Sequence, residues 1–260
     1  MAVKVMETAT TKTARAARQS SRSTSKGGNM PSTTSLRSLD PTGAVIYDGP
    51  SNYDGARIVA IVTQLRGRPT ENRKTGDMAQ VWILRADRVP VEAIRTGHDV
   101  TVCGSCPLRK SVCYVSVIHA PGAVWRAWTR GKYPTVAPAE LETDRPIRFG
   151  AYGDPAAVPA HVWTTLETRP HTGYTHAWHA SPALRPLVMA SVDTATQATI
   201  AQSRGWRTFR AKAADDSLLP GEITCPASDE AGHRTDCATC RLCDGARAND
   251  RRANIAINVH

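Results

Sequence analysis

Residues 147–155, with the sequence IRFGAYGDP, decide the fold, because a strand-like run ends there at a turn and a helical pattern follows over 156–168. The same alternation continues toward the carboxyl terminus. Further strands are predicted at 173–178, 187–192, 206–211 and 254–259, with one helix that Asp193 or Thr194 caps and that ends before Gly205. Strands separated by helices favour parallel pairing through right-handed crossovers. We therefore expect an α/β fold, either a partial (β/α) barrel or an open parallel sheet, because about five or six units are too few for a closed barrel.

The segment before these units is predicted to contain a β-hairpin. Residues 56–65 and 78–85 are rich in aliphatic and β-branched side chains, and a polar loop lies between them. The loop carries four cations, namely Arg66, Arg68, Arg73 and Lys74. Such a loop either contacts the phosphates of nucleic acid or is simply solvated, and both interpretations stay open at this point.

Residues 1–42 form a basic tail that we expect to be disordered. The first forty residues hold seven Lys or Arg and two acidic residues. Their net charge of +5 is half of the net charge of +10 of the whole chain. They are rich in Ser, Thr, Ala and Gly and poor in large apolar side chains, so they cannot bury enough surface to offset the entropy cost of ordering. A positive charge of this size also favours polyanionic partners such as nucleic acid.

The remaining residues, 43–260, are expected to form a single α/β domain, with a hairpin region over 43–97 and the βα repeats over 98–260. A chain of 260 residues with 41% apolar side chains is long enough for one sizeable core. No run of the sequence approaches the roughly 20 apolar residues that a membrane span needs. We therefore expect no membrane contact and a cytoplasmic location.

The seven cysteines fall into two groups with the spacing of metal ligands. The first group is spaced C-x2-C-x6-C and the second C-x11-C-x2-C-x2-C: Cys103, Cys106 and Cys113, then Cys225, Cys237, Cys240 and Cys243. In a reducing compartment such groups indicate metal ligation and not disulfides. Three thiolates suit a 4Fe-4S cluster with one open iron, and four suit a complete cluster. Zinc is the alternative metal, for which His233 could replace one cysteine.

Polar residues are predicted to gather where strands end, which is where parallel sheets bind ligands. The cysteine loop, the turn at Gly153-Asp154 and the segment from Ser191 to Asp193 are each expected to follow a strand directly and to share one rim. His176 is a candidate proton donor at this rim. Each of these residues also has a structural interpretation, because Asp154 or Asp193 could cap a helix and His176 could make only a local hydrogen bond.

This arrangement resembles the radical S-adenosylmethionine enzymes, whose partial barrel carries a three-cysteine loop after its first strand and a Gly-Gly-Glu-Pro-like segment after its second. The matching elements are the cysteine loop over 103–113, with Tyr114 behind it, and the segment YGDP at 152–155. The resemblance implies that the open iron takes the amine and carboxylate of S-adenosylmethionine, and that the turn at Gly153 and Asp154 receives the amino group. It also implies an electron donor. The spacing departs from the usual C-x3-C-x2-C, so the likeness is one of architecture.

Four motifs spread over 55–260 carry a second resemblance. They are CGSCPLR at 103–109, GAYGDP at 150–155, TGYTH at 172–176, and CPAS at 225–228 with the three cysteines that follow. Together they look like an uncharacterised family found in bacteriophages and mobile elements, the gene-product-eighty-eight-like proteins. This likeness implies a phage or plasmid setting and a bacterial host, and it brings no established activity.

Two functions are consistent with these features. The first is a cytoplasmic iron–sulfur protein that resembles radical S-adenosylmethionine enzymes, with an open cluster and an auxiliary cluster, in which Tyr114, Ser191 and Asp193 join the turn at 153–154 in holding the cofactor. The second is a phage or plasmid nucleic-acid-binding protein whose zinc or iron–sulfur sites only brace the fold. A salt-dependent affinity for DNA or RNA would favour the second function.

Overall fold

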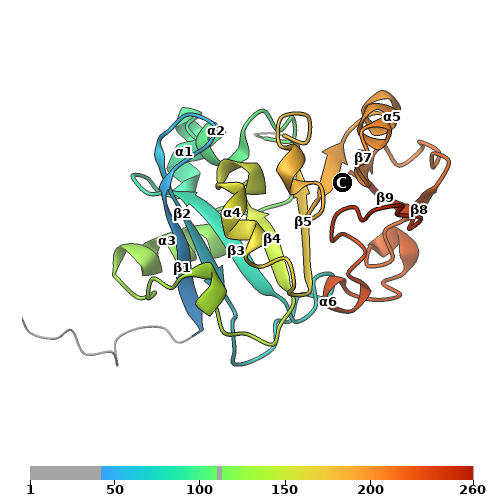
Figure 1. The fold of residues 1–260 in the computed structure, drawn as a ribbon. Coiled ribbons are helices and arrows are strands. Elements are labelled where there is room, and N and C mark those ends of the chain that lie inside the picture. Colours follow the sequence, from blue (N-terminus) through green and yellow to red (C-terminus); the bar gives the residue numbers. More distant parts are fainter. Residues whose placement is uncertain (1–41, 110–112, 260) are drawn as a thin grey trace, which may run out of the picture. The chain divides into compact units, whose positions relative to one another are not determined.

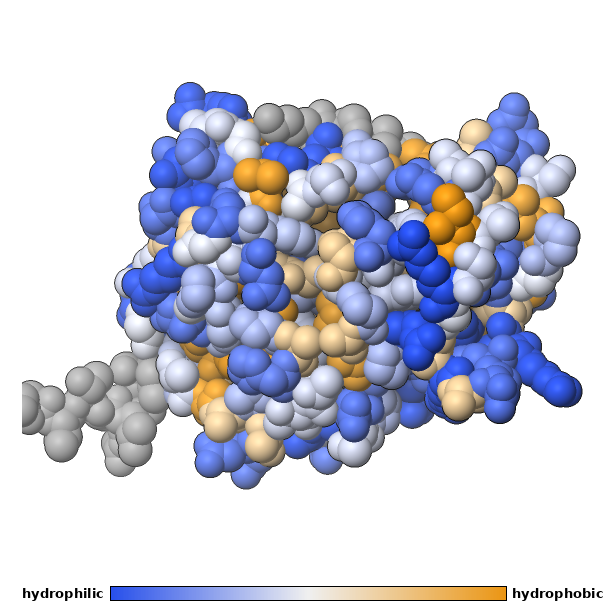
Figure 2. Space-filling view, turned by 45° about the horizontal axis from the view of Figure 1, so that its top comes forward, coloured by the Kyte–Doolittle hydropathy of each residue, from blue (hydrophilic) through white to orange (hydrophobic). Residues whose placement is uncertain are grey.

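The computed structural model describes residues 42–109 and 113–259, which belong to one compact unit. The predicted tail, apart from residue 42, lies outside the described residues. Within the described ranges, no helix is both long enough and apolar enough to cross a membrane. The face seen in Figure 2 is mostly hydrophilic, and its apolar patches are small and separate.

Nine strands form one sheet in the order β1-β2-β3-β4-β5-β6-β7-β9-β8 (Figure 1). Their bounds are β1 Gly43–Pro50, β2 Arg57–Thr63, β3 Ala79–Arg85, β4 Ile147–Tyr152, β5 His171–Thr175, β6 Met189–Val192, β7 Thr208–Lys212, β8 Glu222–Thr224 and β9 Asn254–Asn258. The pairs β1–β2 and β2–β3 are antiparallel, and every later pair is parallel. The expected hairpin and the expected open parallel sheet are therefore confirmed, whereas β1 and β8 have no counterpart among the predicted strands.

Short helices connect the strands. The α-helices are α1 Pro90–Thr96, α2 Val100–Cys103, α3 Ala120–Thr129, α4 Ala160–Thr164, α5 Ala195–Ser203 and α6 Cys237–Cys240, with 3-10 turns η2 Pro138–Glu140, η3 Pro155–Ala157, η4 Pro182–Leu184 and η5 Asp229–Ala231. The prediction of one continuous helix over 156–168 is wrong. Val158 is extended before Pro159, because a proline disfavours helical backbone in the residue before it. The capping prediction for α5 holds, since the Thr194 hydroxyl accepts from the Gln197 N–H at 3.1 Å.

The first cysteine group follows a helix and not a strand, so that part of the prediction is also wrong. After β3 the chain passes through α1 and α2, and Cys103 is the last residue of α2. The group still lies at the carboxyl ends of the strands, because the Asp154 N–H, just after β4, donates to the Val102 carbonyl at 2.6 Å. In Figure 1, α2 lies at the upper end of the strands and α6 at the lower end, beside β5.

The sheet carries an apolar core on each face. On one face, Phe149 of β4 packs on Trp163 of α4, and His171 of β5 stacks on the same phenyl ring, each pair with ring centroids 4.8 Å apart. Because side chains alternate along a strand, Tyr174 projects from the other face, where it packs on Phe209 at 4.4 Å. Five further buried residues complete this smaller core: Met189, Cys225, Ala227, Cys243 and Ile255. The second cysteine group therefore lies on the face opposite α4.

Candidate metal centres

The four cysteines of the second group line one pocket, together with Tyr174, Phe209 and Ile255 of the sheet. Cys225 follows β8, and its N–H donates to the Ala256 carbonyl of β9 at 2.8 Å. Cys237 and Cys240 are the first and last residues of α6. Cys243 accepts at its carbonyl from the Gly173 N–H of β5 at 2.9 Å. Residues far apart in the chain are thus brought together at one place.

The loop between β2 and β3 holds α6 in position. The N–H groups of Cys237 and Ala238 donate to the carbonyls of Lys74 and Thr75, at 2.9 and 3.0 Å. Asp236 caps α6, since its carboxylate accepts from the Thr239 N–H at 2.8 Å. The polar loop predicted as a nucleic-acid contact is therefore, at its carboxyl-terminal end, a support for the four-cysteine pocket.

The charge balance of this pocket favours a cation. Burial raises the pKa of the Cys225, Cys237 and Cys243 thiols, and charge on neighbouring thiolates raises it further. Lys74 and Arg148 act in the opposite direction on Cys237, lowering its pKa. Four thiolates cannot ionise together in this place unless positive charge compensates them, and a bound metal supplies that charge.

The first cysteine group is closed by a buried ion pair. The Arg109 guanidinium donates to both oxygens of Asp99, at 2.8 and 2.6 Å, and also to the Gly104 carbonyl at 2.9 Å. Asp99 is itself 1% exposed. This clamp fixes the turn from Cys103 to Cys106, while Cys113 is exposed and follows residues 110–112, which lie outside the described ranges.

The three thiols interact electrostatically. Burial raises the pKa of Cys103 most, and Asp99, Cys106 and Cys113 raise it further. Burial also raises the pKa of Tyr152 at the end of β4, with added contributions from Cys103 and Cys113. Charge on Cys106 and Cys113 therefore acts on Cys103, and charge on Cys103 and Cys113 acts on Tyr152.

Asp154 serves the framework of the rim. Its carboxylate accepts from the N–H of Ala156 and from the N–H of His176, both at 2.9 Å. Gly153 has a φ of +84°, and a Cβ there would lie 2.7 Å from Cβ of Ile83. The turn predicted to receive a ligand amine thus holds β4 against β3 and β5. Asp154 caps the turn that follows it, which is the structural role that the sequence also allowed.

Three other predicted rim residues do converge. His176 Nε2 lies 3.1 Å from Ser191 Oγ, 3.7 Å from an Asp193 oxygen and 4.0 Å from Cys106 Sγ. Burial lowers the pKa of His176, but Asp193 and Cys106 outweigh it and raise the value to about 10. A protonated imidazole therefore lies beside the first cysteine group.

Arg148 links the two cysteine groups, and sequence reasoning does not single it out. It donates through Nη2 to the hydroxyl of Tyr114, whose side chain is exposed, and its charge partly offsets the rise that burial causes in the pKa of Cys237. Its Nε is buried and has no hydrogen-bond partner among the described residues. The sequence does contain one sign of this role, a charged residue in the otherwise mostly apolar strand IRFGAY at 147–152.

The four loop cations have separate environments. Arg66 pairs with Glu142 at 3.6 Å, and Arg68 pairs with Glu71 at 2.6 Å. Arg73 is exposed, whereas Lys74 lines the four-cysteine pocket. The structure does not bring these cations together as one patch.

His233, the alternative zinc ligand, does not line the four-cysteine pocket. Its Nδ1 lies 3.1 Å from the Ala227 carbonyl, and its Nε2 contacts the Asp229 carboxylate. Over residues 42–109 and 113–259, no three His, Cys, Asp or Glu side chains lie close enough together to hold one metal ion. Comparison with known protein families, curated proteins and solved structures finds no match to this chain.

Proposed function

We propose that this protein is an iron–sulfur enzyme that resembles the radical S-adenosylmethionine enzymes, with one open and one complete 4Fe-4S cluster. The observation that carries the proposal is the placement of the thiols. One group gathers at the carboxyl ends of parallel strands, and the other lines a single pocket on a face of the same sheet. Sets of three and four soft thiolate donors suit an open and a closed cluster.

The donor chemistry of the four-cysteine pocket suits such a group. Two of its thiols are buried and two are half-buried, so the pocket excludes most water. Tyr174 packs over it, and Lys74 and Arg148 add positive charge near Cys237. A bound cluster supplies one-electron chemistry, whose potential such charges and burial adjust. An external electron donor is the partner that this chemistry requires.

At the first group, in this proposal, polar side chains beside the thiols would bind the ligand. His176, Ser191 and Asp193 converge next to Cys106 and are the side chains that would meet a small ligand. His176 holds a proton at Nε2 that it can donate to a ligand carboxylate, and the Asp193 carboxylate can accept from a ligand amine. Asp154 acts as a positioning residue, because it binds the His176 N–H.

Cleavage of S-adenosylmethionine to 5'-deoxyadenosine tests the enzyme claim. Protein purified without oxygen, with a chemical reductant, is expected to form the product, and Cys106→Ser is expected to form none. Ser203→Ala, at the exposed end of α5, is the matched control and should behave as the wild type. A protein with full clusters that forms no 5'-deoxyadenosine would refute the enzyme claim and leave the metal sites standing.

The second candidate is a nucleic-acid-binding protein with structural metal sites, zinc or iron–sulfur. It is favoured by the exposed side chains of Arg66, Arg68 and Arg73 on the β2–β3 loop. Its test is the affinity for DNA and RNA at several salt concentrations, with Arg68→Glu and Arg73→Glu in the full chain. Affinity that falls with salt and with both substitutions supports it, and affinity that ignores salt counts against it.

A further inference from the structure

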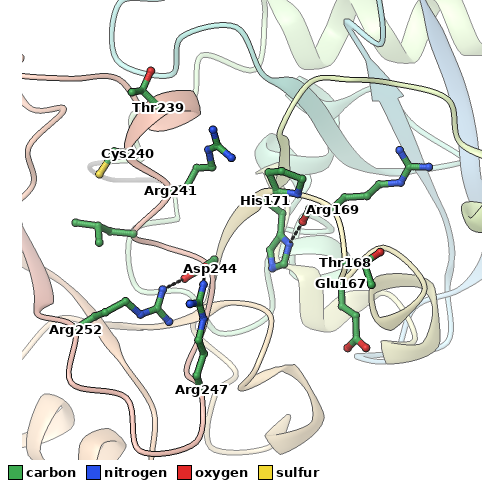
Figure 3. A pocket seen from close by; sticks show the side chains of 12 residues that line it. Glu167, Thr168, Arg169, His171, Thr239, Cys240, Arg241, Asp244, Arg247 and Arg252 are labelled. Carbon is green, nitrogen blue, oxygen red and sulfur yellow. Dashed lines mark hydrogen bonds and ion pairs between the residues drawn. The ribbon is translucent and has the colours of Figure 1, made fainter.

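A second pocket opens at the amino ends of the strands, away from the first cysteine group (Figure 3). Its volume is about 500 Å³, and its walls are the turn that precedes β5 at 167–170, His171, and the chain from α6 onward. Cys240, Arg241 and Leu242 line this pocket and the four-cysteine pocket as well. The two pockets therefore share a wall.

The pocket is basic. Four arginines and two carboxylates line it: Arg169, Arg241, Arg247 and Arg252, with Glu167 and Asp244. Two of these arginines have structural roles, because their side chains bind other parts of the chain. Arg169 donates to the carbonyls of Leu141 and Thr143, at 2.5 and 3.2 Å. Arg252 donates to Asp250 and Asp244.

The other two arginines keep nitrogens free for a ligand. Arg241 donates only through Nε, to the Ala238 carbonyl at 2.8 Å, and its two terminal nitrogens have no partner in the described part of the chain. Arg247 donates through one terminal nitrogen to Asp244, at 2.8 Å. Figure 3 shows the Arg241 guanidinium between the α6 segment and His171, and the Arg247 side chain beside Asp244 and Arg252.

His171 adds a buried nitrogen that lacks a partner. The residue is 6% exposed, and its ring stacks on Phe149. Nδ1 lies 2.7 Å from the Arg169 carbonyl, so Nδ1 carries the proton and donates it, whereas Nε2 has no partner among the described residues. A buried polar atom without a partner costs free energy, and a ligand that donates to Nε2 would recover it.

The backbone of Arg241 is in the left-handed region, with a φ of +50°. Arg241 is the residue that ends α6, and a left-handed residue is a common way for a helix to end. Here the turn keeps Cys240 in the shared wall and sends the Arg241 side chain into the basic pocket.

We propose that this pocket binds a small phosphate-bearing molecule. Arg241 and Arg247 offer planar, charged donors that match phosphate oxygens in pairs. A hydroxyl on the phosphate or on an attached sugar supplies the donor that Nε2 of His171 lacks. A volume of about 500 Å³ fits a ligand of nucleotide size. The proposal stands on this pocket alone and does not depend on which metal the cysteines hold.

Calorimetric titration of the full chain tests the site, with inorganic phosphate and adenosine 5'-monophosphate as probes and adenosine as the uncharged control. We expect saturable binding of both phosphate probes and at least 10-fold weaker binding of adenosine. Arg241→Asn, which keeps a residue that tolerates the left-handed backbone, and Arg247→Ala should each weaken binding at least 10-fold. Arg57→Ala removes another exposed arginine, beside the carboxyl end of β3 and so at the opposite end of the strands, and should change nothing.

Two outcomes would overturn the proposal. One is the absence of saturable heat with either phosphate probe. The other is an equal loss of affinity in Arg57→Ala, which would indicate general attraction to a basic surface. Circular dichroism and metal content equal to wild type establish that each arginine variant is folded. His171→Gln is a further variant that should weaken binding, and if it fails to fold the arginine variants decide alone.

Discussion

At the scale of single residues, buried charge is concentrated where the chain must hold a loop in one shape. The Asp99–Arg109 pair closes the first cysteine loop, and Arg207 lies among Asp244, Asp250 and Arg252 below the four-cysteine pocket. The grouping of the four later cysteines in one pocket is predictable, because their spacing is specific. Arg148, Arg109 and Tyr174 are not, since their roles arise from contacts with segments that are distant in the sequence.

Removing Arg109 should be costly. Arg109→Met leaves the Asp99 carboxylate buried without its partner, and breaking such a pair costs about 3–5 kcal/mol of the free energy of unfolding. Arg57→Met, which breaks an exposed pair with Asp48, is the control and should have little effect. Urea unfolding of both variants measures the difference, and equal losses would show that the Asp99–Arg109 pair is not structural.

The network around Asp250 predicts a dependence on pH. Hydrogen bonds from Arg252 hold the pKa of the Asp250 carboxyl well below its usual value of 3.8, against the effect of burial. A carboxyl with a depressed pKa in the folded state stabilises the fold above its unfolded pKa, and this stabilisation is lost as the pH falls. Asp250→Asn should therefore be about 2 kcal/mol less stable than wild type at pH 6. The difference in free energy of unfolding between wild type and Asp250→Asn should narrow below about pH 4. Unfolding curves that give the same difference at every pH would contradict a depressed pKa for Asp250.

At the scale of elements, turns and caps connect the strands to the sites. The turn at 153–154 brings β4 against Ile83 of β3 and against the Val102 carbonyl of α2. Apolar runs and a capping threonine are enough to predict β2–β7, β9 and α5. The break at Pro159 follows from the proline itself and could be predicted from the sequence. The helical approach to Cys103 and the short β8 could not, because tertiary contacts decide them.

Gly153→Ala should disturb the rim. The new Cβ would lie 2.7 Å from Cβ of Ile83 and 2.9 Å from its carbonyl oxygen, at a φ of +84°. We expect a loss of about 3 kcal/mol or more. Gly131→Ala is the matched control, because φ there is +67° and the added Cβ meets no atom within 4 Å; it should lose about 1 kcal/mol. Thermal unfolding measures both variants, and equal losses of stability in Gly153→Ala and Gly131→Ala would refute the close packing of Gly153 against Ile83.

The cap of α6 should matter for metal as well as for stability. Asp236→Ala and Thr194→Ala each remove one side-chain cap, from α6 and from α5, and each should cost about 1 kcal/mol. Only Asp236→Ala should release metal more readily from the four-cysteine pocket, because only α6 carries metal ligands in our proposal. Metal analysis after mild chelation measures this, and equal retention in both variants would argue against a metal on α6.

At the scale of the whole molecule, one mostly parallel sheet carries the three candidate sites. The first cysteine group lies at the carboxyl ends of the strands, the second lies on one face, and the basic pocket opens at the amino ends. The expectation of a ligand site at the carboxyl ends follows from the order of strands and helices alone. The position of the second group and the existence of the basic pocket do not, because both depend on how the segment 225–252 folds back across the sheet.

The central claim, that the cysteines hold two iron–sulfur clusters, is tested most directly by iron, sulfide and zinc analysis with an absorption spectrum of protein purified without oxygen. We predict a brown protein that absorbs broadly near 400 nm, with about eight irons and about eight sulfides per chain, and about half of each in the double variant Cys237→Ser and Cys240→Ser. A colourless protein with one or two zinc ions and no sulfide would contradict the claim and leave the thiols with a structural role.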